Sequence, residues 1–194
     1  MAFWFGILIG GLFAWLAVKI GFYETWAMLF NIVVSVYLAI FLRPVIATIA
    51  PAAGGTAYGG VLTVLATALA CFAILHGISY VYFTSQFNVS FPKVLNVVAA
   101  GCLGFLAGLL IWSFVSILIY ISPISQNSLV RDIGFDSQYR QTSVSYTSWW
   151  CNRINSLVGT KRPRYTTEQF LNELFEEAEK RAADANKPSA TGNP

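Results

Sequence analysis

Residues 94–121 form the run VLNVVAAGCLGFLAGLLIWSFVSILIYI, which contains no charged side chain. A helix of about 20 apolar residues is long enough to cross the hydrocarbon core of a bilayer. Inside lipid the backbone must satisfy its own hydrogen bonds, so such a run is expected to be helical. It is followed by Ser122-Pro123, and proline does not continue a helix. The stretch therefore predicts one membrane-spanning helix.

Three more apolar runs precede it, at residues 3–18, 25–42 and 58–83. The second is expected to stop at Arg43-Pro44, a cation at the negative helix end followed by a helix breaker. The other breaks fall at residues 19–24, 51–55 and 84–92. The sequence thus predicts an all-α integral membrane protein with four transmembrane helices. An even number of spans places both termini on the same side.

The charged residues are distributed unevenly along the chain. The protein is 56% hydrophobic and only 11% charged, whereas soluble domains carry about 25% charged residues. The charged side chains before Pro123 are Lys19, Glu24, Arg43 and Lys93. We therefore expect a transmembrane domain over residues 1–123 and a polar C-terminal tail over 124–194. The formal net charge of +3 is small and does not indicate a nucleic-acid partner.

Within the tail, residues 124–165 mix serine, threonine, tyrosine and arginine around Trp149-Trp150. An amphipathic helix is predicted near residues 166–186, with Thr166 as its N-cap and Gln169 at the reciprocal position of a capping box. Its apolar stripe comprises Phe170, Leu171, Leu174, Phe175 and Ala178. The final residues, 187–194, are expected to be disordered.

Small residues recur at four-residue spacing in two of the predicted spans. They are Gly6 and Gly10 in the first, and Ala100, Gly104 and Gly108 in the fourth. This spacing places small residues on one helix face, where two backbones can approach closely. We expect these residues to pack helices against each other within the bundle. The pattern is also compatible with an interface between copies of the chain.

His76 is the only histidine, and it is expected to lie deep in the third span. An ionisable side chain inside a membrane helix is a functional candidate, and imidazole is a ligand for haem or a chlorophyll-type metal. No second histidine exists, and Cys71 is roughly 140° away around a helix. We expect a neutral His76 hydrogen-bonded to a neighbouring helix, near the membrane interface with Ser79 and Tyr80. A ligand role is the less favoured alternative.

Few other side chains suggest chemistry. Cys71, Cys102 and Cys151 are far apart, which indicates neither a disulfide nor a metal site. The spans carry three short polar seams, which are expected to join helices: Asn31 with Ser35, Thr63 with Thr67, and Ser113 with Ser116. No acidic or basic residue lies at mid-span, which argues against an ion-coupled transporter. The sequence predicts no catalytic residues, no metal site and no cofactor, and therefore not an enzyme.

Two short motifs resemble those of the colicin V production protein (CvpA) family, small proteins of the bacterial inner membrane. The first is the turn Lys19-Ile20-Gly21-Phe22-Tyr23-Glu24, and the second is the G-x-L-x-G motif at residues 104–108. The resemblance covers about residues 3–120. Where the family tends to have an acidic-basic pair, this chain has Asn96 and Val97. The resemblance implies a multi-pass protein linked to colicin V production or export and to envelope function, with no catalytic residues to carry over.

Three functions follow as hypotheses. The first is a non-enzymatic envelope protein of that family, acting through helix packing and its tail. The second is an accessory subunit of a larger membrane complex, and the third is a small oligomeric channel or transporter. The expected partners are the lipid bilayer and either further copies of the chain or subunits of a membrane complex.

The orientation in the membrane stays open, because two indications conflict. The positive-inside rule compares Lys19 and Lys93 on one side with Arg43, Arg131 and Arg140 on the other, which is too close to decide. The family resemblance implies that both termini lie outside the cytoplasm. The predicted amphipathic helix of the tail favours a cytoplasmic docking element and cytoplasmic termini.

Overall fold

The structure is a computed structural model that describes residues 2–49, 58–84, 92–126, 130, 132–158 and 167–185. These residues contain helices and no strand. The α-helices are α1 (Ala2–Ile20), α2 (Phe22–Phe41), α3 (Arg43–Ile49), α5 (Gly59–Ser79), α6 (Lys93–Ile121), α8 (Ser137–Val158) and α9 (Thr167–Ala185). A π-helical turn, η1 (Tyr80–Thr84), extends α5, and a 3₁₀ turn, η2 (Pro123–Gln126), follows α6.

Four helices are long and apolar enough to cross a membrane, at residues 2–20, 22–41, 59–82 and 96–121. Each coincides within a few residues with one of the four predicted apolar runs. The prediction of an all-helical chain with four such helices is therefore confirmed for the described part of the chain. The break predicted at 51–55 lies outside the described residues, as does most of 84–92.

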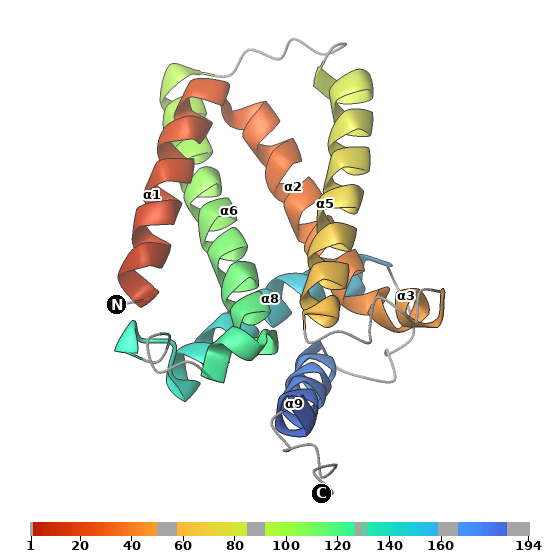
Figure 1. The fold of residues 1–194 in the computed structure, drawn as a ribbon. Helices are drawn as coiled ribbons and strands as arrows, with labels where there is room; N and C mark the ends of the chain where they lie inside the picture. Colours follow the sequence, from red (N-terminus) through yellow and green to blue (C-terminus); the bar gives the residue numbers. More distant parts are fainter. Residues whose placement is uncertain are drawn as a thin grey trace, which may run out of the picture.

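The four long helices alternate in direction (Figure 1). Helices α1 and α6 lie side by side and antiparallel, and α2 lies between this pair and α5. The start of α1 and the C-terminal helices α8 and α9 occupy the same end of the bundle. A hydrogen bond of 3.0 Å from the backbone nitrogen of Ala2 to the carbonyl oxygen of Ile133 ties the start of α1 to the segment before α8.

The second long helix ends where the sequence predicts, just before Arg43-Pro44, but the chain beyond it was not predicted to be helical. The helix ends at Phe41, and Arg43-Pro44 begins a further short helix, α3, instead of stopping helical structure. Proline is tolerated in the first turn of a helix, because the backbone donor that it lacks would have no partner there. The breaker therefore separates two helices.

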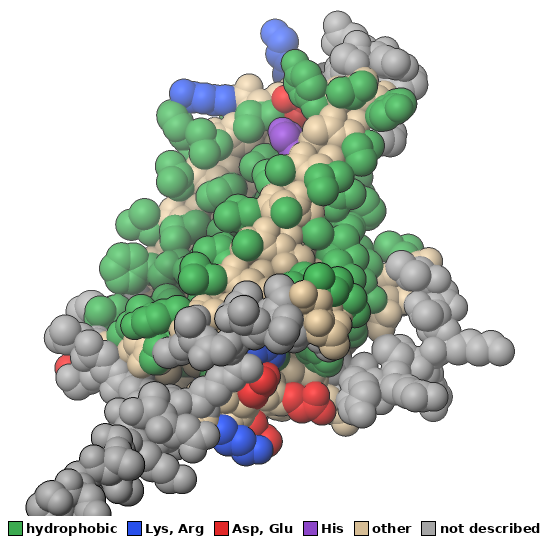
Figure 2. Space-filling model, turned by 45° about the vertical axis from the view of Figure 1, so that its right-hand side comes forward, with side chains coloured by type: hydrophobic (Ala, Val, Ile, Leu, Met, Phe, Trp, Pro, Cys, Tyr) green, Lys and Arg blue, Asp and Glu red, His purple; other side chains and the backbone are tan. Residues whose placement is uncertain are grey.

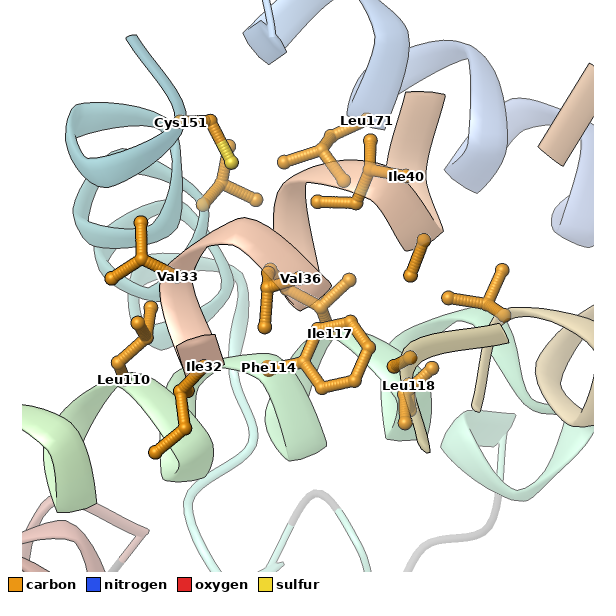
Figure 3. Close-up of a cluster of buried hydrophobic side chains, with 14 of the residues drawn as sticks. Ile32, Val33, Val36, Ile40, Leu110, Phe114, Ile117, Leu118, Cys151 and Leu171 are labelled. Atoms are coloured by element: carbon orange, nitrogen blue, oxygen red, sulfur yellow. The ribbon is translucent and has the colours of Figure 1, made fainter. Parts of the chain in front are cut away.

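The hydrophobic core lies toward the tail end of the bundle. It joins the second half of α2 to the second half of α6, and α8 and α9 contribute to the same cluster. Figure 3 labels its members Ile32, Val33, Val36, Ile40, Leu110, Phe114, Ile117, Leu118, Cys151 and Leu171. Away from this core, apolar side chains cover the length of the bundle, and the charged side chains in view gather at its two ends (Figure 2).

Helix α8 was not assigned from the sequence. Its start is capped by Asp136, whose Oδ1 accepts a 2.8 Å hydrogen bond from the backbone nitrogen of Tyr139. Acidic residues favour this position because the first backbone donors of a helix have no partner within it. Helix α9 begins at Thr167, so the predicted cap Thr166 lies outside the described residues, as does the expected disordered end at 187–194.

Candidate functional site

Helices α1 and α6 pack closely, and Gly104 on α6 faces the backbone of α1. A Cβ atom added to Gly104 would collide with the Cβ of Ala17 and would lie 2.6 Å from the carbonyl oxygen of Phe13. Backbone atoms cannot move aside as a flexible side chain can. Position 104 therefore accepts only glycine unless the two helices separate.

The other predicted small residues line the same contact, called here the glycine seam. A Cβ on Gly108 would lie 2.8 Å from the Cα of Gly10, so these two backbones touch. Gly10 and Gly6 each receive an aromatic ring from α6, since an added Cβ would lie 2.8 Å from ring atoms of Phe105 and Trp112 respectively. Ala100 is fully buried. The seam glycines thus pack α1 against α6 within a single chain.

Two further glycines show that small residues alone do not make such a contact. An added Cβ would meet nothing within 4 Å at Gly11 on α1 or at Gly77 on α5. Gly11 directly follows Gly10 in the sequence but faces outward. The seam is therefore specific to one face of each helix.

At the opposite end from the tail, Asn96 connects α6 to the turn between α1 and α2. Its Oδ1 accepts a 2.7 Å hydrogen bond from the backbone nitrogen of Phe22, which satisfies one of the free donors at the start of α2. The neighbouring Gly21 has φ of 104°, a conformation that favours glycine. The uncharged amide of Asn96 thus joins two helices.

The polar seams within the long helices behave differently from one another. Asn31 is buried and forms a mutual hydrogen bond with Ser79 of α5, at 3.0 Å from its Nδ2 and 3.2 Å to its Oδ1. The hydroxyls of Thr63 and Thr67 instead donate to carbonyl oxygens four residues earlier in their own helix. Ser35 and Ser116 bond in the same way. Of these described hydroxyl and amide bonds, the Asn31–Ser79 pair is the one that links two helices.

His76 lies in the last turn of α5 and is exposed, not deep within the helix. Its ring stacks on Phe72, with centroids 5.4 Å apart and planes 9° apart. Figure 2 shows it near the charged side chains at this end of the bundle. Among the described residues, no group of three or more histidine, cysteine or acidic side chains is placed to hold a metal ion.

At the tail end, polar contacts hold α8 and α9 onto the bundle. Arg43, at the start of α3, forms a 3.0 Å ion pair with Glu177 of α9. The hydroxyl of Tyr37 on α2 donates to Oδ1 of Asn155 on α8 at 3.2 Å. Thr167 donates to Oδ1 of Asn152 at 3.0 Å and so joins α9 to α8. The apolar core of Figure 3 joins α2, α8 and α9 as well.

Trp112 is a junction residue that sequence reasoning missed. Its Nε1 lies 3.1 Å from the carbonyl oxygen of Ala2 and 2.6 Å from the hydroxyl oxygen of Tyr139. One indole therefore connects the start of α1, the middle of α6 and the start of α8. An aromatic residue in an apolar run carries no sequence signal for such a role.

A cavity of about 670 Å³ opens between the end of α6, the start of α8 and α9. Tyr120, Asp136, Arg140 and Glu179 are among its polar lining residues. Arg140 and Glu179 form an ion pair of 3.4 Å across it, and the hydroxyl of Tyr120 donates to the carbonyl oxygen of Asp136. These polar groups of the cavity lining therefore bond to one another.

Cys151 is buried in the core between α8 and α2, where burial raises the pKa of its thiol to about 12. A thiol that stays protonated is a poor nucleophile and a poor metal ligand. The other two cysteines are also free. Cys151 therefore acts as a small core residue.

Comparison of the chain with protein-family models, with curated proteins and with solved structures finds no match. The class of protein is therefore defined by its fold and internal contacts. The chain is an all-helical protein, in its described part, with four helices fit to span a membrane. Its distinguishing features are a glycine seam between α1 and α6 and a pair of C-terminal helices packed on α2 and α6.

Proposed function

We propose that the chain is a non-enzymatic, multi-pass protein of the bacterial inner membrane that assists secretion or envelope function through helix packing. The resemblance to the colicin V production family supports this function. The observation that carries the membrane part of the proposal is the outward surface of α1 and α5. Large apolar side chains cover it, including Phe3, Trp4, Leu8, Leu62, Leu69 and Ile74.

This apolar surface is too extensive to be exposed to water in a soluble protein. The buried residues of α1 are Ala2, Gly6, Gly10 and Ala17, and most of its large side chains are exposed. Contiguous apolar faces of this kind are covered by lipid or by other protein. The polar helices α8 and α9 gather at one end of the bundle, where a membrane protein meets water (Figure 1). Both observations support a protein that crosses the bilayer and presents its tail on one side.

The function is tested by deleting the gene in its own host and measuring leakage of a periplasmic marker and sensitivity to detergent. We expect the deletion to raise both, and the wild-type gene to restore them. Gly104→Leu should fail to restore them, because it opens the glycine seam, whereas Gly77→Leu should succeed, since it faces open space. An envelope unaffected by the deletion would contradict the proposal.

An accessory subunit of a larger membrane complex is the second candidate, and one observation favours it. The outward face of α5 carries exposed small residues at Ala66, Ala70, Ala73 and Gly77. Such a face allows another membrane helix to approach closely. Isolation from native membrane in mild detergent distinguishes the two candidates. Partners in fixed stoichiometry would favour the subunit, and a chain isolated alone or as copies of itself would favour the first proposal.

A further inference from the structure

Helix α8 has two edges of different chemistry. One edge carries Tyr146, Trp149, Trp150, Arg153 and Leu157, at the spacing of residues that share one side of a helix. The other edge carries Gln141, Ser145 and Asn152. The second edge faces α9, because Asn152 accepts the hydrogen bond of Thr167. α8 therefore combines an aromatic edge and an amide-rich edge, as helices that lie in a membrane interface do.

The aromatic edge lies beside the long helices and not beyond their ends. The hydroxyl of Tyr146 donates to the carbonyl oxygen of Leu106 at 3.2 Å. Leu106 precedes the end of α6 at Ile121 by about 22 Å, at 1.5 Å per residue. Tyr37, which bonds to α8 from α2, is one turn from the end of its helix. Tyr146 thus lies on the flank of the bundle, while Asn155, two residues beyond Arg153, lies beside the last turn of α2. The part of α8 that carries Arg153 is therefore level with the end of a long helix, the depth at which a span meets lipid headgroups.

The two described arginines of α8 differ in their partners. Arg140 forms an ion pair with Glu179. Arg153 has no acidic partner within the described residues, and its guanidinium lies over the ring of Trp149, 5.0 Å from the centroid. The Trp149 side is open, since this residue is 50% exposed and Leu157, one turn beyond Arg153, is 76% exposed. The Arg153 guanidinium is positioned by the Trp149 ring, and the exposed apolar side chain of Leu157 lies one turn away. A guanidinium beside apolar side chains is suited to bind a phosphate that is attached to acyl chains.

We propose that Trp149 and Arg153 form a binding site for the headgroup phosphate of an anionic phospholipid, with Leu157 against its acyl region. The inference rests on the proposed membrane location. The site fixes α8, and with it the tail, against one leaflet. The sequence after α8 adds Lys161, Arg162 and Arg164, which lie outside the described residues and outside this site.

The test uses the full chain in a mild detergent and measures the dissociation constant for dioctanoyl phosphatidylglycerol by native mass spectrometry. Arg153→Gln should weaken binding about fivefold, the factor that corresponds to about 1 kcal/mol for one basic side chain at an anionic lipid surface. Arg153→Lys should retain most of the affinity. Arg140→Gln is the matched control on the same helix, and it should bind as the wild type does. Dioctanoyl phosphatidylcholine should bind more weakly than phosphatidylglycerol to the wild type.

Three results would overturn the site. They are equal affinity in wild type and Arg153→Gln, an equal loss in Arg140→Gln, and competition by inorganic phosphate at the lipid's concentration, which would indicate a site for the free anion. Membrane fractionation of the same variants separates this failure from failure of the proposed function. A protein that stays in the membrane after alkaline extraction, but has no Arg153-dependent lipid binding, would contradict the lipid site alone.

Discussion

The two halves of α6 make contacts of opposite kinds. In the first half, Gly104 and Gly108 present bare backbone to α1, and the helices touch through main-chain atoms. In the second half, Leu110, Phe114 and Ile117 present large side chains to α2, and α8 and α9 complete the same cluster. Between helices in lipid, association depends on packing contacts and hydrogen bonds. At the tail end, which includes polar helices, burial from water also contributes.

The difference shows how one helix can hold two unlike partners. At Gly104 and Gly108 the seam has no room for added atoms on α6. The core at the tail end needs filled volume and is weakened by the loss of atoms. Substitutions that enlarge a residue should therefore damage the first half, and substitutions that shrink a residue should damage the second.

The largest expected effect concerns the reactivity of Cys151 in the second contact. In a Cys71→Ala, Cys102→Ala background, Cys151 should react roughly 30- to 60-fold more slowly at pH 8 than an ordinary thiol. Burial raises its pKa from 9.0 to about 12, which lowers the thiolate fraction, and the higher nucleophilicity of the more basic thiolate offsets part of this loss. The rate should rise with pH toward that value and should increase sharply on unfolding. The control is Ser156→Cys combined with Cys151→Ala, because Ser156 is exposed on the same helix. Equal rates at the two positions would show that α8 is not packed on α2.

Leu171→Ala should lower the free energy of unfolding by about 2–5 kcal/mol, the range for a fully buried leucine that leaves a cavity. Leu171 is completely buried where α9 joins the core. The measurement is chemical unfolding in detergent, with limited proteolysis to detect release of α9. Leu157→Ala removes the same atoms from an exposed position and should leave stability and proteolysis unchanged.

Gly104→Leu should lower the free energy of unfolding by about 1–3 kcal/mol through overpacking of the glycine seam. The matched control is Gly77→Leu, where a side chain meets nothing within 4 Å. Thermal stability in detergent reports both. If Gly104→Leu melted at the wild-type temperature, α1 and α6 would not be in backbone contact.

Ser79→Ala should have the smallest of these effects, about 1 kcal/mol, because it removes the partner of the buried Asn31 between α2 and α5. Thr67→Ala is the control, since the Thr67 hydroxyl bonds within its own helix. The same melting assay compares them. A loss as large in Thr67→Ala would show that the Asn31–Ser79 bond contributes nothing specific.

The sequence predicted the four long helices because each depends on a property of the run itself, about 20 apolar residues without charge. It did not predict α8, because the buried face of that helix mixes Val144, Cys151 and Ile154 with the hydroxyl residues Ser143, Thr147 and Ser148, which interrupt the apolar stripe. Asp136, at the cap position, was the available sign. A helix whose buried face mixes apolar and hydroxyl residues gives a weaker periodic signal than one with a continuous apolar stripe.

The glycine seam was predicted as a set of residues and not as a pair of helices. The four-residue spacing identifies a face, but the partner of Gly104 is Ala17, which belongs to no such pattern in the prediction. The same limit applies to His76. Its position in the third run suggested depth, whereas the end of α5 within that run places it in an exposed last turn.

The central claim is that the four long helices cross a membrane with both termini on the same side. Reporter fusions after Gly54, after Gln86 and at the C-terminus test it most directly, with the native orientation preserved in cells. We predict that the fusions at Gly54 and the C-terminus report one side and the fusion at Gln86 reports the other. If the fusion at Gln86 reported the same side as either of the others, the four-span arrangement would be wrong.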